Sequence, residues 1–105
     1  MTQDSPQVQA IRARFKNSFA EKKQLIDQHQ LNIQDVESQE GMSLKDVFEL
    51  AHTDLHKLAG SFGMYGYSDV ALICRSAMKA TANEDVAESL TLLTQLSNEL
   101  SGYLK

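Results

Sequence analysis

Apolar residues recur three or four positions apart in four long segments of the chain, a spacing that places them on one face of a helix. The first segment predicts a helix from Pro6 to Gln30, with Ser5 as its N-cap and proline at the first helical position. Its inward face would consist of Val8, Ile11, Phe15, Phe19, Lys22 and Ile26.

The second segment predicts a helix that begins after Ser43. Asp46 follows three residues later, and this pair is similar to a capping box, in which each side chain accepts a hydrogen bond from the other residue's backbone N–H. We expect the helix to end between Gly63 and Gly66. Its apolar face would consist of Leu44, Val47, Phe48, Ala51, Leu55, Leu58 and Phe62.

Two further helices are predicted before the C-terminus, and one connection precedes them. Ser68 can cap the third helix, and Asn83 can cap the fourth, whose first turn carries acids that favour the helix dipole. Residues 31–42 are expected to connect the first two helices, with a short extra turn starting at Asn32. The expected inward residues of the third and fourth helices are Val70, Ile73, Ala77, Met78, Val86, Leu90, Leu93, Leu100 and Leu104.

These elements predict the fold class. No segment alternates with the period of a strand, and no repeat of fixed length is present. Four amphipathic helices with short links indicate an all-α fold, an antiparallel four-helix bundle with an additional short N-terminal or connecting helix. The length of 105 residues fits a single domain that spans residues 1–105.

Composition and charge narrow the class of function. The net charge of −4 disfavours a nucleic-acid binder, because phosphate contacts need a basic face. No apolar run reaches the ~20 residues of a membrane span, and the N-terminus is too polar for a signal peptide. The single cysteine, Cys74, cannot form an internal disulfide and is expected to be buried and inert. We therefore expect a cytoplasmic protein that binds neither nucleic acid nor membrane.

The stretch "AHTDLHKLAGSFGMYGYSDV", residues 51–70, carries two histidines and two glycines on one side of the predicted second helix. At about 100° per residue, His52, Gly60 and Gly63 lie within about 40° of His56 and away from the apolar face. A glycine within a helix costs about 1 kcal/mol relative to alanine, so a cause beyond helix formation is needed. Either another protein closely approaches the strip formed by His52, His56, Gly60 and Gly63, or the glycines let a neighbouring helix pack closely or end the second helix.

The segment "HKLAGSFGMYG", which starts at His56, resembles the signature of histidine-containing phosphotransfer (HPt) domains. That signature has a histidine followed by glycine four residues on, a small residue at seven and glycine at ten, here Gly60, Gly63 and Gly66. Chain length, helix number and acidic balance agree with the family at a coarser level. The chain departs from the family at Ala59, where many members carry a lysine.

The resemblance implies a carrier in a two-component phosphorelay. His56 would accept a phosphoryl group from the aspartyl phosphate of one receiver domain and pass it to an aspartate of another. The unperturbed pKa of a histidine side chain is about 6.5, so a neutral, nucleophilic imidazole is available at pH 7. The partners would be receiver domains of response regulators and of a hybrid sensor kinase. We expect a monomer that carries phosphate without being an enzyme.

The resemblance also indicates a surface on which receivers would dock. We expect the residues around His56 to form it: Lys57, Ala59, Gly60, Gly63, His52 and Met64. The chain has no Walker loop and no clustered acids for Mg²⁺, so it would have no cofactor of its own, and the metal would come with the receiver. Whether Lys57 replaces the lysine missing at Ala59 stays open.

Two other interpretations use the same residues. His52 and His56 are spaced to share a metal, but Thr53 stands where a zinc-protease helix has glutamate, and a third ligand would have to be His29, Cys74 or a carboxylate. We therefore expect no metal site. The alternative function is a helical adapter that binds a signalling partner through the same face without carrying phosphate.

Overall fold

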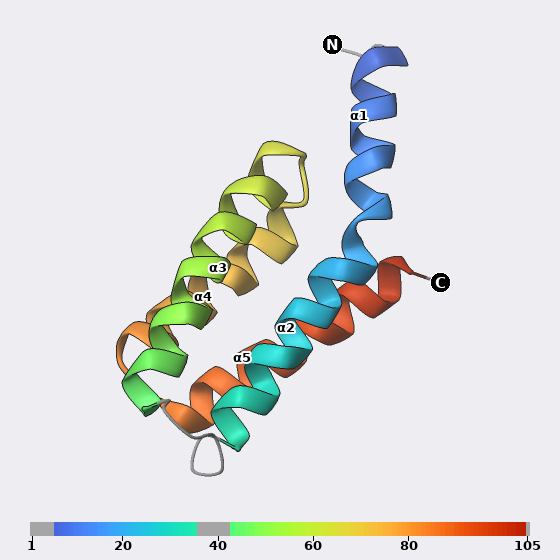
Figure 1. Cartoon of the computed structure of the whole chain (residues 1–105). Coiled ribbons are helices and arrows are strands. Elements are labelled where there is room, and N and C mark those ends of the chain that lie inside the picture. Colours follow the sequence, from blue (N-terminus) through green and yellow to red (C-terminus); the bar gives the residue numbers. More distant parts are fainter. Residues whose placement is uncertain (1–5, 36–42, 105) are drawn as a thin grey trace.

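The computed structural model describes residues 6–35 and 43–104, and these form α-helices and no strand. The fold is therefore all-α, as the spacing of apolar residues predicted. The helices, labelled in Figure 1, are α1 (Pro6–Asn17), α2 (Phe19–Gln34), α3 (Leu44–Met64), α4 (Ser68–Ala82) and α5 (Val86–Tyr103).

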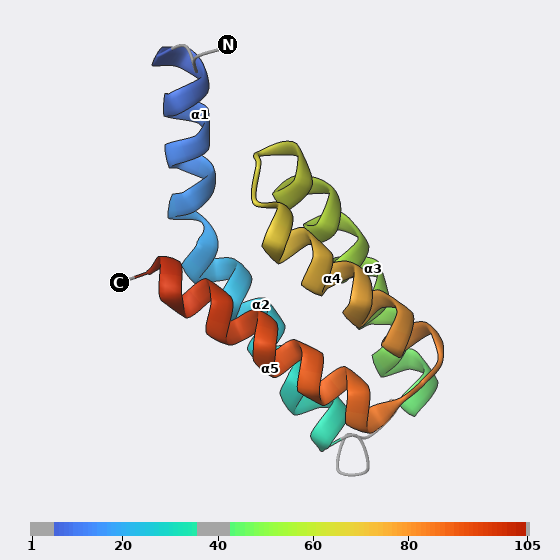
Figure 2. The same ribbon diagram turned by 180° about the vertical axis from the view of Figure 1, so that it is seen from behind.

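Helices α2 to α5 form an antiparallel bundle. In Figures 1 and 2, α2 and α5 lie side by side on one side of the molecule, and α3 and α4 lie side by side on the other. Contacts between α4 and α5 and between α2 and α3 close the ring, and the α2–α3 side is the most sparsely packed. The four-helix bundle is thus confirmed, and α1 is the additional N-terminal helix.

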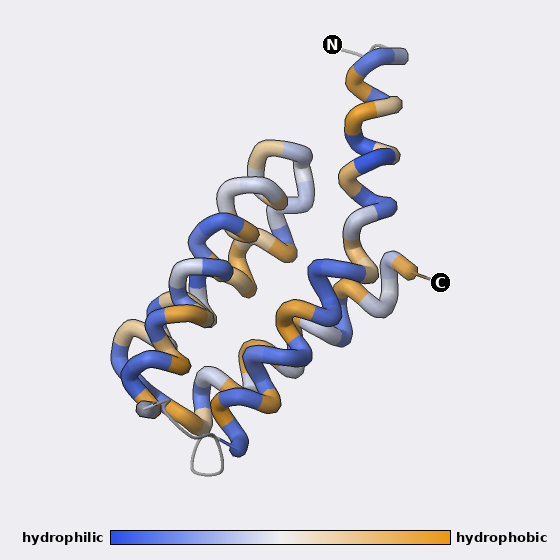
Figure 3. The backbone as a smooth tube through the Cα atoms, in the orientation of Figure 1, coloured by the Kyte–Doolittle hydropathy of each residue, from blue (hydrophilic) through white to orange (hydrophobic). Residues whose placement is uncertain are grey.

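Each helix of the bundle is amphipathic. Hydrophilic and hydrophobic residues share every bundle helix in Figure 3, as helices with one buried face require. Within residues 6–35 and 43–104, no helix combines the length and the apolar character that crossing a bilayer demands. The largest fully buried apolar side chains are Phe19, Ile26, Val47, Phe48, Leu55, Phe62, Val70, Leu93, Leu96 and Leu100.

The predicted first helix is two helices in the structure. Ser18 separates α1 from α2, and its hydroxyl and backbone N–H both donate to the carbonyl of Phe15. A serine that bonds locally in this way competes with the helical hydrogen-bond pattern. The predicted end at Gln30 was also wrong, because α2 continues to Gln34 and Asn32 lies inside it rather than capping a new turn. Residues 36–42 of the predicted connection lie outside the described residues.

Helix α1 extends away from the bundle and buries none of its side chains (Figures 1 and 2). Val8 and Ile11 are therefore exposed, although their spacing predicted an inward face. Two side chains of α1 still contact the bundle. The ring of Phe15 stacks on Tyr65 at 4.3 Å between centroids and meets the edge of Phe62 at 5.3 Å, and the guanidinium of Arg12 lies 5.9 Å from the centroid of the Tyr67 ring.

The beginnings of α3 and α5 are capped by side chains. Ser43 Oγ accepts from the backbone N–H of Asp46, whose carboxylate accepts from the backbone N–H of Ser43, so the capping box is confirmed. At α5 the cap is Asp85, whose Oδ1 accepts from the backbone N–H of Glu88 at 3.0 Å. The prediction of Asn83 was wrong, because this residue ends α4 instead.

The turn between α3 and α4 explains one glycine of the motif. The N–H of Tyr67 bonds the carbonyl of Phe62 at 2.8 Å, and the N–H of Gly66 bonds that of Gly63 at 3.2 Å. This is a Schellman turn, and Gly66 has a φ of 87°, which favours glycine. Helix α4 then begins at Ser68, with Tyr67 rather than the predicted Ser68 at the N-cap position.

A carboxylate links α2 to α5. Asp27 accepts hydrogen bonds from Ser97 Oγ at 2.6 Å and from Lys23 Nζ at 2.8 Å. Burial tends to raise the pKa of Asp27, but the hydrogen bonds from Lys23 and Ser97 outweigh it. The pKa therefore lies below its ordinary value of 3.8, and the carboxylate supports the fold in its charged form.

Candidate functional site

His56 lies in the middle of α3, and its side chain is exposed. The same helix turns Leu55 and Leu58 into the core, where both are buried. Because successive side chains point about 100° apart, burial of these leucines holds the imidazole on the outer side of the helix. The placement of His56 on a solvent-facing strip agrees with the sequence analysis.

A groove of about 310 Å³ runs beside His56 between α3 and α4. Ala59 and Gly60 line it from α3, and Arg75 and Met78 line it from α4. A second groove, of about 520 Å³, lies farther toward the C-terminal end of α3 and shares Ala59, Gly60 and Arg75 with the first. Its other lining residues are Gly63, Met64, Ser68, Ala71 and Leu72.

The two helical glycines border these grooves without being needed for the packing of α4. A Cβ at Gly60 would meet no atom within 4 Å, apart from its own backbone surroundings. A Cβ at Gly63 would lie 3.7 Å from Arg75 Nη2 and 4.0 Å from Ala71 Cβ, which are ordinary contact distances. An alanine would therefore fit at either position, and close approach of a neighbouring helix does not account for the glycines.

The residues predicted to form the docking surface are not all exposed. Lys57, Gly60 and Gly63 are exposed around His56, and Met64 is 76% exposed. Ala59, in contrast, is only 4% exposed, because α4 packs over it. The prediction that the Ala59 position shares the exposed face of the histidine was therefore wrong, and this residue forms part of the groove floor.

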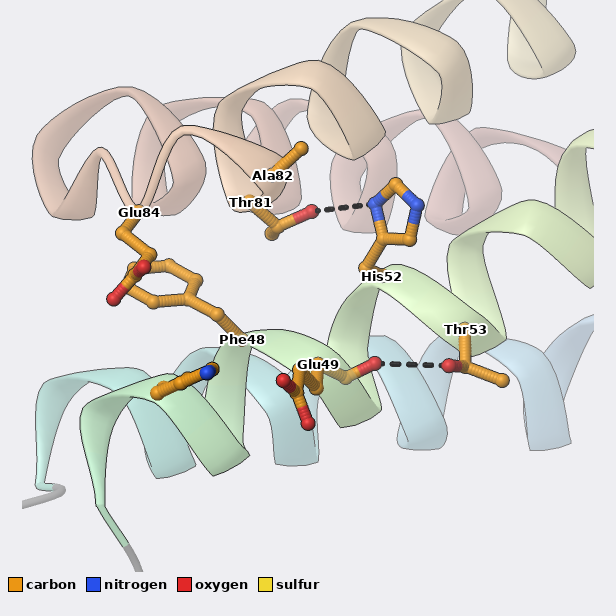
Figure 4. A pocket seen from close by; sticks show the side chains of 8 residues that line it. Phe48, Glu49, His52, Thr53, Thr81, Ala82 and Glu84 are labelled. Carbon is orange, nitrogen blue, oxygen red and sulfur yellow. Dashed lines mark hydrogen bonds between the residues drawn. The ribbon is translucent and has the colours of Figure 1, made fainter.

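His52 is half-buried and joins α3 to α4. Its Nδ1 lies 3.0 Å from the carbonyl oxygen of Met78. The same nitrogen lies 3.4 Å from Thr81 Oγ1, a contact drawn in Figure 4. A carbonyl oxygen only accepts, so we assign a proton to Nδ1 and leave Nε2 as the unprotonated nitrogen of the neutral ring. His52 is thus anchored to α4, although the sequence placed it on the exposed docking surface around His56.

His52 also lines a pocket of about 400 Å³ between the first half of α3 and the end of α4 (Figure 4). Thr53, on the same helix, donates a hydrogen bond from its hydroxyl to the backbone carbonyl of Glu49 at 2.9 Å. The remaining lining residues are Lys45, Phe48, Thr81, Ala82 and Glu84.

The residues weighed as a third metal ligand are engaged elsewhere. His29 Nε2 lies 2.6 Å from Asp54 Oδ2 at the α2–α3 contact. Cys74 is fully buried, and burial raises the pKa of its thiol to about 12. Among residues 6–35 and 43–104, no group of three His, Cys, Asp or Glu side chains is placed to hold a metal ion.

Arg75 is the residue of this site that the sequence analysis missed. It is exposed on α4 and lines both grooves that run beside His56, Gly60 and Gly63. Nothing in the part of the chain that the structure describes forms a hydrogen bond or ion pair with its guanidinium. The sequence held no signal for it, because only the packing of α4 on α3 brings the two faces together.

Comparisons with protein-family models, with curated proteins and with solved structures found no match to this chain. The function is therefore inferred from the geometry around His56 and from the resemblance of its sequence surroundings to the HPt signature.

Proposed function

We propose that this protein is a histidine phosphotransfer carrier in a two-component phosphorelay. His56 accepts a phosphoryl group from the aspartyl phosphate of a receiver domain and passes it to an aspartate of another receiver. The observation that carries the proposal is the exposed imidazole of His56 on a packed helix, beside Gly60 and Gly63, which present only backbone to a docking partner.

The transfer step requires a nucleophile that the aspartyl phosphate of a docked receiver can reach. The unprotonated ring nitrogen of His56 forms a bond to phosphorus while the P–O bond to the aspartate breaks. The electron pair of that bond stays on the aspartate carboxylate, and the proton on the other ring nitrogen remains in place. Phosphoryl transfer depends mainly on positioning and on charge stabilisation, which two docked proteins can share.

The surface around the histidine suits a docked domain. Met64 and Leu72 are exposed apolar side chains that line the larger groove, next to the bare surface of Gly60 and Gly63. Exposed apolar side chains beside a polar reactive group are typical of a protein interaction site. The receiver is expected to bring Mg²⁺ and the acidic pocket that holds it.

A transfer assay tests the proposal. Several receiver domains, each phosphorylated by a small-molecule donor in Mg²⁺, are mixed with the wild type, His56→Gln and His52→Gln. We expect acid-labile, base-stable label on the wild type and on His52→Gln, and none on His56→Gln with unchanged helicity. His52→Gln is the matched control, because it removes an imidazole one turn away on the same helix.

The other outcomes would contradict the proposal in different ways. Label retained on a folded His56→Gln would move the site to another residue. Absence of label on the wild type from every receiver, together with binding of a receiver to the same face, would favour the adapter that carries no phosphate.

A further inference from the structure

We propose that Arg75 binds the phosphoryl group carried by His56 and is the cation that stabilises its charge. This inference rests on the proposed function and adds a second residue to the same site. It concerns a side chain from α4, whereas the resemblance pointed only to residues of α3 and of the turn that follows it.

The first support is that His56 and Arg75 line the same groove. Gly60 lines it too, and the space where a Cβ would stand there is open for at least 4 Å. A phosphoryl group bonded to the imidazole would therefore have room within a groove whose opposite wall carries a guanidinium.

The second support is the position of the guanidinium itself. Arg75 Nη2 lies 3.7 Å from the point that a Cβ of Gly63 would occupy, so the side chain reaches across from α4 to the surface of α3. Within residues 6–35 and 43–104, no carboxylate pairs with it. Its charge is thus available, and the planar donor array of arginine suits the three oxygens of a phosphoryl group.

The third support comes from the other cation near the histidine. Lys57 lines a different groove, on the α2 side of α3, together with Glu21, Lys22 and Asp54. It therefore lies on the far flank of α3, while Arg75 shares the groove of His56. Ala59, where the resemblance expects a lysine, is buried and uncharged. Of these residues, Arg75 is the one placed to take the part of that lysine.

The test measures the ionisation of the phosphoryl group on the intact chain. Phosphoramidate phosphorylates the protein without any partner: its P–N bond breaks, ammonia leaves, and a new N–P bond forms to the ring. The ³¹P resonance of the labelled histidine is assigned by its loss in His56→Gln. Its chemical shift is then titrated with pH in the wild type, Arg75→Gln, Arg75→Lys and Arg14→Gln.

A nearby cation favours the dianion, so it lowers the pKa of the phosphoryl group. We expect Arg75→Gln to raise that pKa by about half a unit, the size of a charge pair in a solvated groove. Arg75→Lys should restore most of the wild-type value. Arg14→Gln is the matched control, because Arg14 is exposed on α1 and lines neither groove beside His56, so its loss should change nothing.

The outcomes separate this inference from the function on which it rests. Equal pKa values in phosphorylated wild type and Arg75→Gln would overturn the role of Arg75 and leave the carrier function standing. A shift of the same size in Arg14→Gln would also overturn it, since a general loss of positive charge would then explain the effect. If the wild type took no phosphate on His56, both proposals would fail together.

Discussion

His29 on α2 and Asp54 on α3 form a pair across the sparsely packed side of the bundle, with 2.6 Å between Nε2 and Oδ2. His29 is only 6% exposed, and its Nδ1 is buried without a hydrogen-bond partner in the described part of the chain. Within residues 6–35 and 43–104, Asp54 therefore supplies the one polar contact of this ring. The pair fixes α2 against the helix that carries His56.

Removal of Asp54 should destabilise the bundle through His29. In Asp54→Ala, both ring nitrogens of a buried imidazole lack partners, and we expect the free energy of unfolding in urea to fall by about 1–3 kcal/mol. The double variant His29→Leu/Asp54→Ala should recover part of this loss, because it leaves no buried polar ring unsatisfied. Additive losses in the double variant would show that the two side chains do not act as a pair.

Two leucines on α3 test how this helix faces the core. Leu55 is 1% exposed, so Leu55→Ala should lower the free energy of unfolding by about 2–5 kcal/mol through lost burial and the cavity left behind. Leu50 is 52% exposed on the same helix, and Leu50→Ala should change it by no more than about 0.5 kcal/mol. Equal costs for the two changes would mean that the helix is rotated about its axis.

Glu84 holds a backbone conformation that suits glycine. Its φ is 53°, its N–H bonds the carbonyl of Thr81, and the N–H of Asp85 bonds that of Ala80, so α4 ends in the same turn as α3 but without a glycine. Glu84→Gly should raise the free energy of unfolding by about 0.5–1 kcal/mol, measured by urea denaturation. Glu84→Ala is the control, because it removes the carboxylate and keeps the strain. A gain as large in Glu84→Ala would assign the effect to charge.

The fold was predictable where periodicity and helix-end chemistry agree. In α3, the capping box at Ser43 and the glycine of the turn at Gly66 mark both ends, and the apolar stripe between them is almost entirely buried. The break at Ser18 was not predictable in this way. Phe15 and Phe19 keep the helical spacing on either side of it, and a single interruption that preserves the spacing leaves no trace in the pattern.

The candidate site was predictable only as far as it lies on one helix. His56, Gly60 and Gly63 share a strip that helical geometry alone places on one side of α3. The burial of Ala59 and the contribution of Arg75 both depend on where α4 packs. That choice is made by tertiary contacts between helices distant in sequence, which the periodicity of a single segment does not encode.

Substitution of Gly60 and Gly63 tests why the chain keeps two glycines that lower the stability of α3. Gly60→Ala adds a methyl group that meets no atom within 4 Å, so it should raise the free energy of unfolding by up to about 1 kcal/mol. If the strip is bare because a receiver must approach it, the same change should slow transfer from a phosphorylated receiver. Phosphorylation by phosphoramidate, which needs no docking, should be unaffected.

Gly63→Gln extends this test to the place on α3 that the guanidinium of Arg75 occupies. A long side chain at this position would compete with the guanidinium that lies 3.7 Å from the Cβ point, while the exposed site leaves the bundle at least as stable. We expect slower receiver transfer and also a raised phosphoryl pKa, as in Arg75→Gln, because the cation is displaced. Unchanged transfer in both glycine variants would mean that the bare strip serves no docking partner, and the glycines would then have no functional explanation.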